Sequence, residues 1–93
     1  MDNRNISVDD PNKLAADGEE IVNTANNFKA EIDAIYNTVD ELKKTWTGGS
    51  AKRYTDDIEK FKEDLYNFEK IVNGHGQLVN SVGKDYIKLE DEL

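Results

Sequence analysis

The sequence contains no cysteine, only one histidine and no run of more than three apolar residues. Without cysteine, neither a disulfide nor a thiolate-bound metal can stabilise the fold. Apolar runs this short cannot span a bilayer, and residues 1–5 lack the apolar segment of a secretory signal peptide. We therefore expect no stable insertion into a membrane and no cleavable signal peptide.

The residue combinations that catalytic and metal sites need are also missing from the sequence. The histidine, His75, follows Val72 by three residues, so the Glu-x-x-His pair of metal-binding helical bundles is missing. Carboxylates of the second half are spread around a helix, as on a solvated surface, at Asp56, Asp57, Glu59, Glu63 and Asp64. We expect no enzyme activity, no cofactor and no metal. We interpret His75 as a core or interface residue, with the hypothesis that its packing is acid-sensitive.

The charge balance narrows the range of partners. Acidic residues outnumber basic ones by 20 to 12, which gives a formal net charge of −8. A field of this sign repels phosphate backbones and anionic lipid headgroups, so we expect no nucleic-acid partner. The length of 93 residues allows one small domain.

Two long segments with the same apolar period lie on either side of residues 46–49. Their apolar or small residues recur in alternating steps of four and three, which is typical of a seam between packed helices. The first seam consists of Leu14, Gly18, Ile21, Ala25, Phe28, Ile32, Ile35, Val39, Leu42 and Trp46. The second consists of Tyr54, Ile58, Phe61, Leu65, Phe68, Val72, His75, Val79, Val82, Tyr86, Leu89 and Leu93. The pattern predicts an all-α fold, an antiparallel helix-turn-helix hairpin.

Local signals set the expected boundaries. We predict a short N-terminal arm at residues 1–9 and a helical hairpin at residues 10–93, with helices at about 10–45 and 51–91 and a turn at 46–50. Asp10 is suited to cap the first helix, and Pro11 to open it. Ser50 is the expected N-cap of the second helix. Residues 73–76 are poor helix formers, but the apolar phase continues from Val72 to Val79, which predicts one continuous helix that is weak or bent at this point.

In a hairpin of two helices, the two seams cover each other only in part. A second stripe of Ala15, Val22, Lys29 and Tyr36 would be wet in such a hairpin, and two helices bury too little surface to offset the chain entropy. We therefore expect two hairpins to dimerise into an elongated four-helix bundle. Gly18 and Ala25 leave two interpretations open: another helix approaches closely, or the helix tolerates a weak spot.

The combination of two heptad helices with Trp46-Thr47-Gly48 between them and Tyr86-Ile87-Lys88-Leu89-Glu90 near the end resembles a known family. This is the Trp-X-Gly (ESAT-like) family of small bacterial substrates of type VII (ESX) secretion. The resemblance covers residues 8–93. It implies a hairpin that dimerises into a four-helix bundle and is secreted, or displayed at the cell surface, without a cleavable signal peptide.

The resemblance also assigns roles to single residues. Trp46 and Gly48 shape the turn, while Tyr86 and Glu90 match the Tyr-x-x-x-Asp/Glu export signal that the type VII secretion ATPase reads. Each aromatic residue also has a structural interpretation, because Trp46 is suited to close the end of the bundle and Tyr86 to fill a core position.

Several functions remain open at this stage. The leading prediction is a homodimeric exported protein that acts as an effector or as a co-secretion or carrier factor. One alternative is a heterodimer, completed by a neighbouring protein or by the helical head of a toxin. An alternative of another class is a cytoplasmic coiled-coil scaffold, and a weaker one is a membrane-perturbing activity at low pH.

Overall fold

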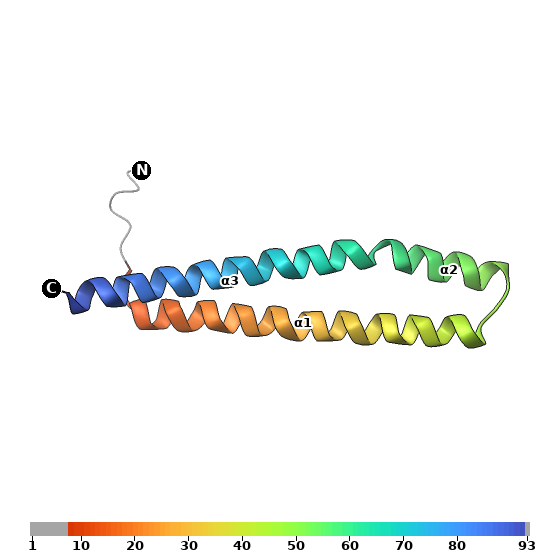
Figure 1. Cartoon of the computed structure of the whole chain (residues 1–93), viewed down its shortest axis with the longest axis horizontal. Coiled ribbons are helices and arrows are strands. Elements are labelled where there is room, and N and C mark those ends of the chain that lie inside the picture. Colours follow the sequence, from red (N-terminus) through yellow and green to blue (C-terminus); the bar gives the residue numbers. More distant parts are fainter. Residues whose placement is uncertain (1–7, 93) are drawn as a thin grey trace. The chain divides into compact units, whose positions relative to one another are not determined.

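The computed structural model describes residues 8–92, which are helical along almost their whole length (Figure 1). The helices are α1 (Pro11–Thr45), α2 (Gly49–Lys60) and α3 (Lys62–Asp91), and residues 8–92 contain no strand. The chain divides into two compact units. We call residues 24–71 the central unit, and the described parts of 1–23 and 72–93 the terminal unit. Most of the arm predicted for residues 1–9 lies outside the described residues.

The start of α1 confirms the predicted cap. The backbone N–H of Lys13 donates to Oδ1 of Asp10 at 3.0 Å, and the N–H of Leu14 donates to the Asp10 carbonyl at 3.0 Å. Pro11 is the first helical residue, where the missing N–H costs nothing. Asp10 therefore satisfies a first-turn donor that would otherwise have no partner within the helix.

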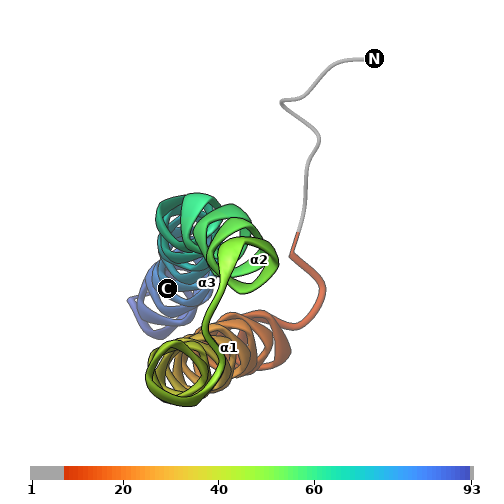
Figure 2. The same cartoon turned by 90° about the vertical axis from the view of Figure 1, so that its right-hand side faces the viewer.

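The turn between α1 and α2 is shorter than the sequence suggested (Figure 2). Gly48, and not Ser50, is the N-cap of α2, and no side chain caps this helix end. Gly48 has φ of 111° and ψ of 171°, a conformation almost restricted to glycine. The predicted Ser50 cap is wrong because the chain reverses two residues earlier, which leaves Ser50 inside the first turn of α2.

Within each unit, α1 buries only part of its predicted seam. Beyond Pro11 at its start, the buried residues of α1 are Ala15, Gly18, Ala25, Ile32, Tyr36 and Val39. Two of these, Ala15 and Tyr36, belong to the flanking stripe that was expected to be wet, so that expectation is wrong for them. By contrast, four large residues of the predicted seam are only half-buried: Leu14, Ile21, Phe28 and Leu42. A fifth, Ile35, is 51% exposed. Compared with the prediction, α1 is therefore rotated about its axis, so that residues of the flanking stripe also face the interior.

The second half of the chain also buries only part of its predicted seam. Its most buried residues after the turn are small or polar: Ala51, Thr55, Glu69, Gly76 and Gly83. The seam residues Ile58, Leu65, Val72, Val79 and Val82 are half-buried, whereas Tyr54, Phe61 and Phe68 are exposed. The aromatic seam residues Tyr54, Phe61 and Phe68 are thus left outside the contact between the helices.

The central unit holds the bulkier core. Ile32, Tyr36 and Val39 are buried together, and Phe28, Ile58, Leu65 and Tyr66 pack against them. The rings of Phe28 and Phe68 meet edge to face, with their centroids 6.2 Å apart. Contacts of α1 residues with α2 and α3 residues run in opposite chain directions, as an antiparallel pair requires.

In the terminal unit the backbones themselves come into contact. A Cβ atom added to Gly18 would lie 2.6 Å from the Asn80 Cα, and one added to Gly83 would lie 2.7 Å from the Ala15 Cα. The Asn80 amide donates to the Ala15 carbonyl at 2.7 Å across the same contact. Of the two interpretations of Gly18, the structure supports close approach of another helix.

The helix is continuous through residues 73–76, as predicted, but the second half of the chain is interrupted at a place that the sequence did not indicate. Residues 73–76 lie within α3, and a Cβ atom on Gly76 would fall 2.9 Å from the Gly18 carbonyl oxygen. The interruption lies at Phe61, between α2 and α3 (Figure 1). The Tyr36 hydroxyl from α1 donates to the Ile58 carbonyl at 2.8 Å. The Phe61 N–H donates to the same carbonyl at 3.1 Å, so the helix tightens to a three-residue step.

Two glycine substitutions test this packing. Gly18→Ala should lower the free energy of unfolding by about 1–3 kcal/mol, because overpacking against the Asn80 backbone outweighs the gain in helix propensity. Gly74→Ala is the matched control, since a Cβ atom there meets nothing within 4 Å. It should raise stability by up to about 1 kcal/mol. Urea denaturation of both variants measures the difference, and equal shifts of the same sign would contradict the close approach.

Candidate functional site

The indole of Trp46 lies at the turn, directly after the last residue of α1. Its backbone N–H donates to the Leu42 carbonyl at 2.7 Å, which continues the α1 bonding pattern by one residue. The side chain remains 43% exposed and packs against Tyr54 of α2, with ring centroids 5.7 Å apart and planes inclined by 59°. Trp46 therefore forms an exposed aromatic pair within the single chain.

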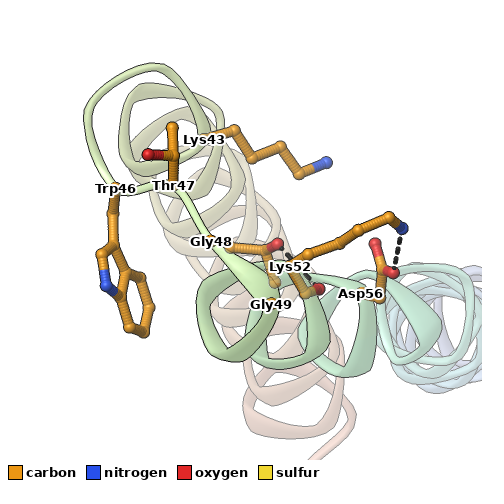
Figure 3. A pocket seen from close by; sticks show the side chains of 8 residues that line it. Lys43, Trp46, Thr47, Gly48, Gly49, Lys52 and Asp56 are labelled. Atoms are coloured by element: carbon orange, nitrogen blue, oxygen red, sulfur yellow. Dashed lines mark hydrogen bonds and ion pairs between the residues drawn. The ribbon is translucent and has the colours of Figure 1, made fainter.

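An open hollow of about 570 Å³ lies beside this turn (Figure 3). Its lining comes from the end of α1, the turn and the first two turns of α2: Lys43, Trp46, Thr47, Gly48, Gly49, Lys52, Thr55 and Asp56. In Figure 3 the Trp46 ring and the Lys52–Asp56 pair point to different sides of the turn. The turn thus presents an aromatic surface and a charged surface separately.

The cations of the hollow are already paired with carboxylates. Lys43 Nζ lies 2.8 Å from Glu59 Oε1, and Lys52 Nζ lies 2.7 Å from Asp56 Oδ2. The hydrogen bond from Lys43 lowers the pKa of Glu59, and the bond from Lys52 lowers the pKa of Asp56. Each lysine of the hollow is therefore already engaged by a carboxylate.

The second candidate motif lies near the end of α3, in the terminal unit. Tyr86 is half-buried, and Glu90 is exposed one helical turn later. The intervening Lys88 and Leu89 are exposed as well. Trp46 and Gly48 belong to the central unit and Tyr86 and Glu90 to the terminal unit. The export role of Tyr86 and Glu90 remains a prediction at this point.

A third feature is the chemical difference between the two sides of the hairpin. In each half of the chain, large residues recur every seven positions next to the buried ones. We call these residues the apolar side, and in the central unit they are Phe28, Ile35, Leu42, Tyr54, Phe61 and Phe68. The contact between Phe28 and Phe68 shows that the two helices contribute to the same side. In the terminal unit the same spacing gives Leu14, Ile21, His75, Val82 and Leu89, of which His75 and Leu89 are exposed. His75 is therefore not a core residue of the single chain, and its interface role stays a prediction.

The opposite side of the central unit is polar. The Tyr66 hydroxyl donates to Oδ1 of Asp33 in a short hydrogen bond, and the Asp33 carboxylate raises the pKa of Tyr66 to about 12. Nearer the turn, Lys43 of α1 donates to Glu59 of α2. The sequence did not indicate Thr55 and Glu69, because two polar residues 14 positions apart give no hydrophobic signal. It did not indicate the Tyr66–Asp33 bond either, because these residues lie 33 positions apart in the chain.

The described part of the chain offers little for other classes of site. Among residues 8–92, no group of three or more histidine, cysteine, aspartate or glutamate side chains is arranged to hold a metal ion. None of the helices α1 to α3 is long and apolar enough to cross a membrane.

The exposure of Trp46 leads to a test of its structural role. Trp46→Ala should lower the free energy of unfolding by far less than the roughly 3–5 kcal/mol typical of a buried tryptophan. The contact with the Tyr54 ring should contribute about 0.5–1.5 kcal/mol, in addition to the small contribution of the partly buried surface. A double-mutant cycle with Tyr54→Ala isolates the ring contact by thermal and urea denaturation. Ile32→Ala is the control for a buried site, at about 2–5 kcal/mol. If Trp46→Ala costs as much as Ile32→Ala, the indole is buried in solution.

Comparison with known proteins gives one match. Residues 6–91 match the WXG100 family, described as proteins of 100 residues with WXG. No curated protein and no solved structure gave a significant match. The matched span contains the Trp46-Thr47-Gly48 turn and the whole of α1, α2 and α3. The chain therefore belongs to the WXG100 family of small helical, ESAT-like substrates of type VII secretion, whose members are not enzymes.

Proposed function

We propose that this protein is exported by a type VII secretion system as a homodimer, in which the apolar sides of two hairpins pack into a four-helix bundle. The observation that carries the proposal is the exposure of large apolar side chains along one side. In the central unit, Ile35, Phe61 and Phe68 are 51%, 61% and 58% exposed. Large apolar side chains exposed on one side of a helix pair are typical of a protein interface.

A second copy of the chain is the partner that fits this surface best. Both helices of the hairpin leave apolar residues uncovered, so a two-fold axis can bring the same surface of each copy into contact. Beside Ile35, an open apolar hollow of about 310 Å³ is lined by Ala34, Thr38 and Val39. It offers space for a large side chain of the partner. A single hairpin otherwise leaves much of its apolar surface in water.

In this proposal Tyr86 and Glu90 form the export signal, and the turn at Trp46 and Gly48 contributes a second recognition surface for the secretion ATPase. Tyr86 and Glu90 lie one turn apart on α3, so a single binding groove can contact both. The exposed pair of Trp46 and Tyr54 is an anchor of the kind found at interfaces. After export the protein acts as an effector or carries a partner with it.

Charge on the apolar side should disrupt the dimer. Ile35→Glu should reduce the solution mass from two chains to one, because a carboxylate would be buried without a partner. Asn37→Glu adds the same charge at an exposed position on α1 outside the apolar side, and it should leave the mass unchanged. Light scattering over a concentration series measures both, and circular dichroism checks that the helices persist.

Three outcomes distinguish the partners. A wild-type mass of two chains that only Ile35→Glu reduces supports the homodimer. A wild-type mass of one chain at all concentrations contradicts it and indicates a different helical hairpin as the partner. Equal dissociation by both substitutions would show that net charge, and not the apolar side, controls association.

Secretion assays test the export signal separately. Tyr86→Ala and Glu90→Ala should each reduce export by at least about tenfold, since each removes an anchor worth about 1–2 kcal/mol or more. Lys88→Ala, an exposed change between them on α3, is the control and should leave export intact. Normal export of both variants would refute the signal and favour a scaffold that stays in the cytoplasm.

A further inference from the structure

The interruption at Phe61 coincides with a hydrogen bond from another helix. Tyr36 lies on α1 and is 3% exposed, and its hydroxyl donates to the Ile58 carbonyl at 2.8 Å. Its ring also lies beneath Lys62 Nζ, which is 5.3 Å from the ring centroid. Tyr36 thus contacts the last turn of α2 and the first residue of α3.

A regular helix would use the Ile58 carbonyl differently. That carbonyl would accept the N–H of the residue four positions later, Lys62. Here it accepts the Tyr36 hydroxyl and the N–H of Phe61, three positions later. A side chain inserted into the helical bonding pattern is a recognised cause of a local break. Burial raises the pKa of Tyr36, so the hydroxyl stays protonated and able to donate.

The tightened step has a geometric consequence for the apolar side. Residues seven apart on a straight α-helix drift by about 20° per heptad, because seven residues fall short of two full turns. A step with three residues per turn advances about 20° more than an α-helical step, which offsets this drift once. The step falls at Phe61, midway between Tyr54 and Phe68. It therefore keeps these three exposed aromatic residues closer to one line.

We propose that Tyr36 is a positioning residue for the dimer interface: its hydrogen bond to Ile58 sets the break at Phe61 and so aligns Tyr54, Phe61 and Phe68 toward the second hairpin. This inference rests on the dimer described under the proposed function. Tyr36 itself is buried and does not need to touch the partner. Its effect passes through the backbone of α2 and α3.

Tyr66 provides a matched control within the same unit. Its hydroxyl also joins α1 to α3, but it bonds the side chain of Asp33 and leaves the backbone pattern of α3 intact. Tyr66→Phe and Tyr36→Phe therefore each remove one hydroxyl and one contact between helices. Only Tyr36→Phe releases a backbone carbonyl at the break.

The experiment combines a local readout with an association readout on the full chain. Tyr36→Phe should slow amide hydrogen exchange at Lys62 at least about tenfold, because the Ile58 carbonyl becomes available four residues back. It should also raise the dimer dissociation constant at least about tenfold, measured by analytical ultracentrifugation. Tyr66→Phe should produce neither change. The exchange measurement is repeated with Ile35→Glu added to each tyrosine variant, so that the exchange rate at Lys62 is also compared in chains that do not associate.

The outcomes separate this inference from the proposed function. Unchanged exchange at Lys62 in Tyr36→Phe, or equal weakening of the dimer by both variants, overturns the positioning role. Altered exchange with an unchanged dimer also overturns it, because the break would then not affect the interface. A wild-type chain that remains monomeric at every concentration overturns the proposed dimer itself, together with this inference.

Discussion

The close contact between helices in the terminal unit limits what each helix can place in the interior. A Cβ atom added to Gly18, Gly76 or Gly83 would lie less than 3.0 Å from the facing helix, so these three positions must be small. Large residues spaced for helix packing are then displaced to the side. The central unit accommodates Ile32 and Tyr36 inside, yet it also leaves Phe61 and Phe68 exposed. The apolar side is therefore a consequence of how the helices pair.

The polar side has a complementary role. Tyr66 with Asp33 and Lys43 with Glu59 join the helices of the central unit through groups that stay hydrated. Exposed ion pairs contribute little stability, but they make this side unfavourable for an apolar partner. The central unit consequently has an apolar side and a polar side. In the proposed dimer, this difference determines which sides of the two copies meet.

The helical hairpin could be predicted from the sequence because an apolar period of 3.5 residues constrains helices strongly. The rotation of each helix could not, since Leu14 and Ala15 were equally plausible as interior residues by period alone. The interior stripe through Thr55 and Glu69 gave no hydrophobic signal. The break at Phe61 depends on Tyr36, which is distant in sequence, whereas propensity pointed to Gly74 and Gly76. Among the candidate site residues, Trp46 and Gly48 were found by motif. The uncapped start of α2 was not predicted, because it depends on the backbone conformation of Gly48.

Gly48 shows what the turn selects for. No atom lies within 4 Å of a Cβ added there, so the space around it does not demand a small residue. Its φ of 111° and ψ of 171° do demand glycine among L-amino acids. The mirror image of this conformation is ordinary extended backbone, so a D-residue of almost any size would fit. The glycine of the WXG motif is thus required at this position by backbone chirality, and the surface above it remains free to meet a partner.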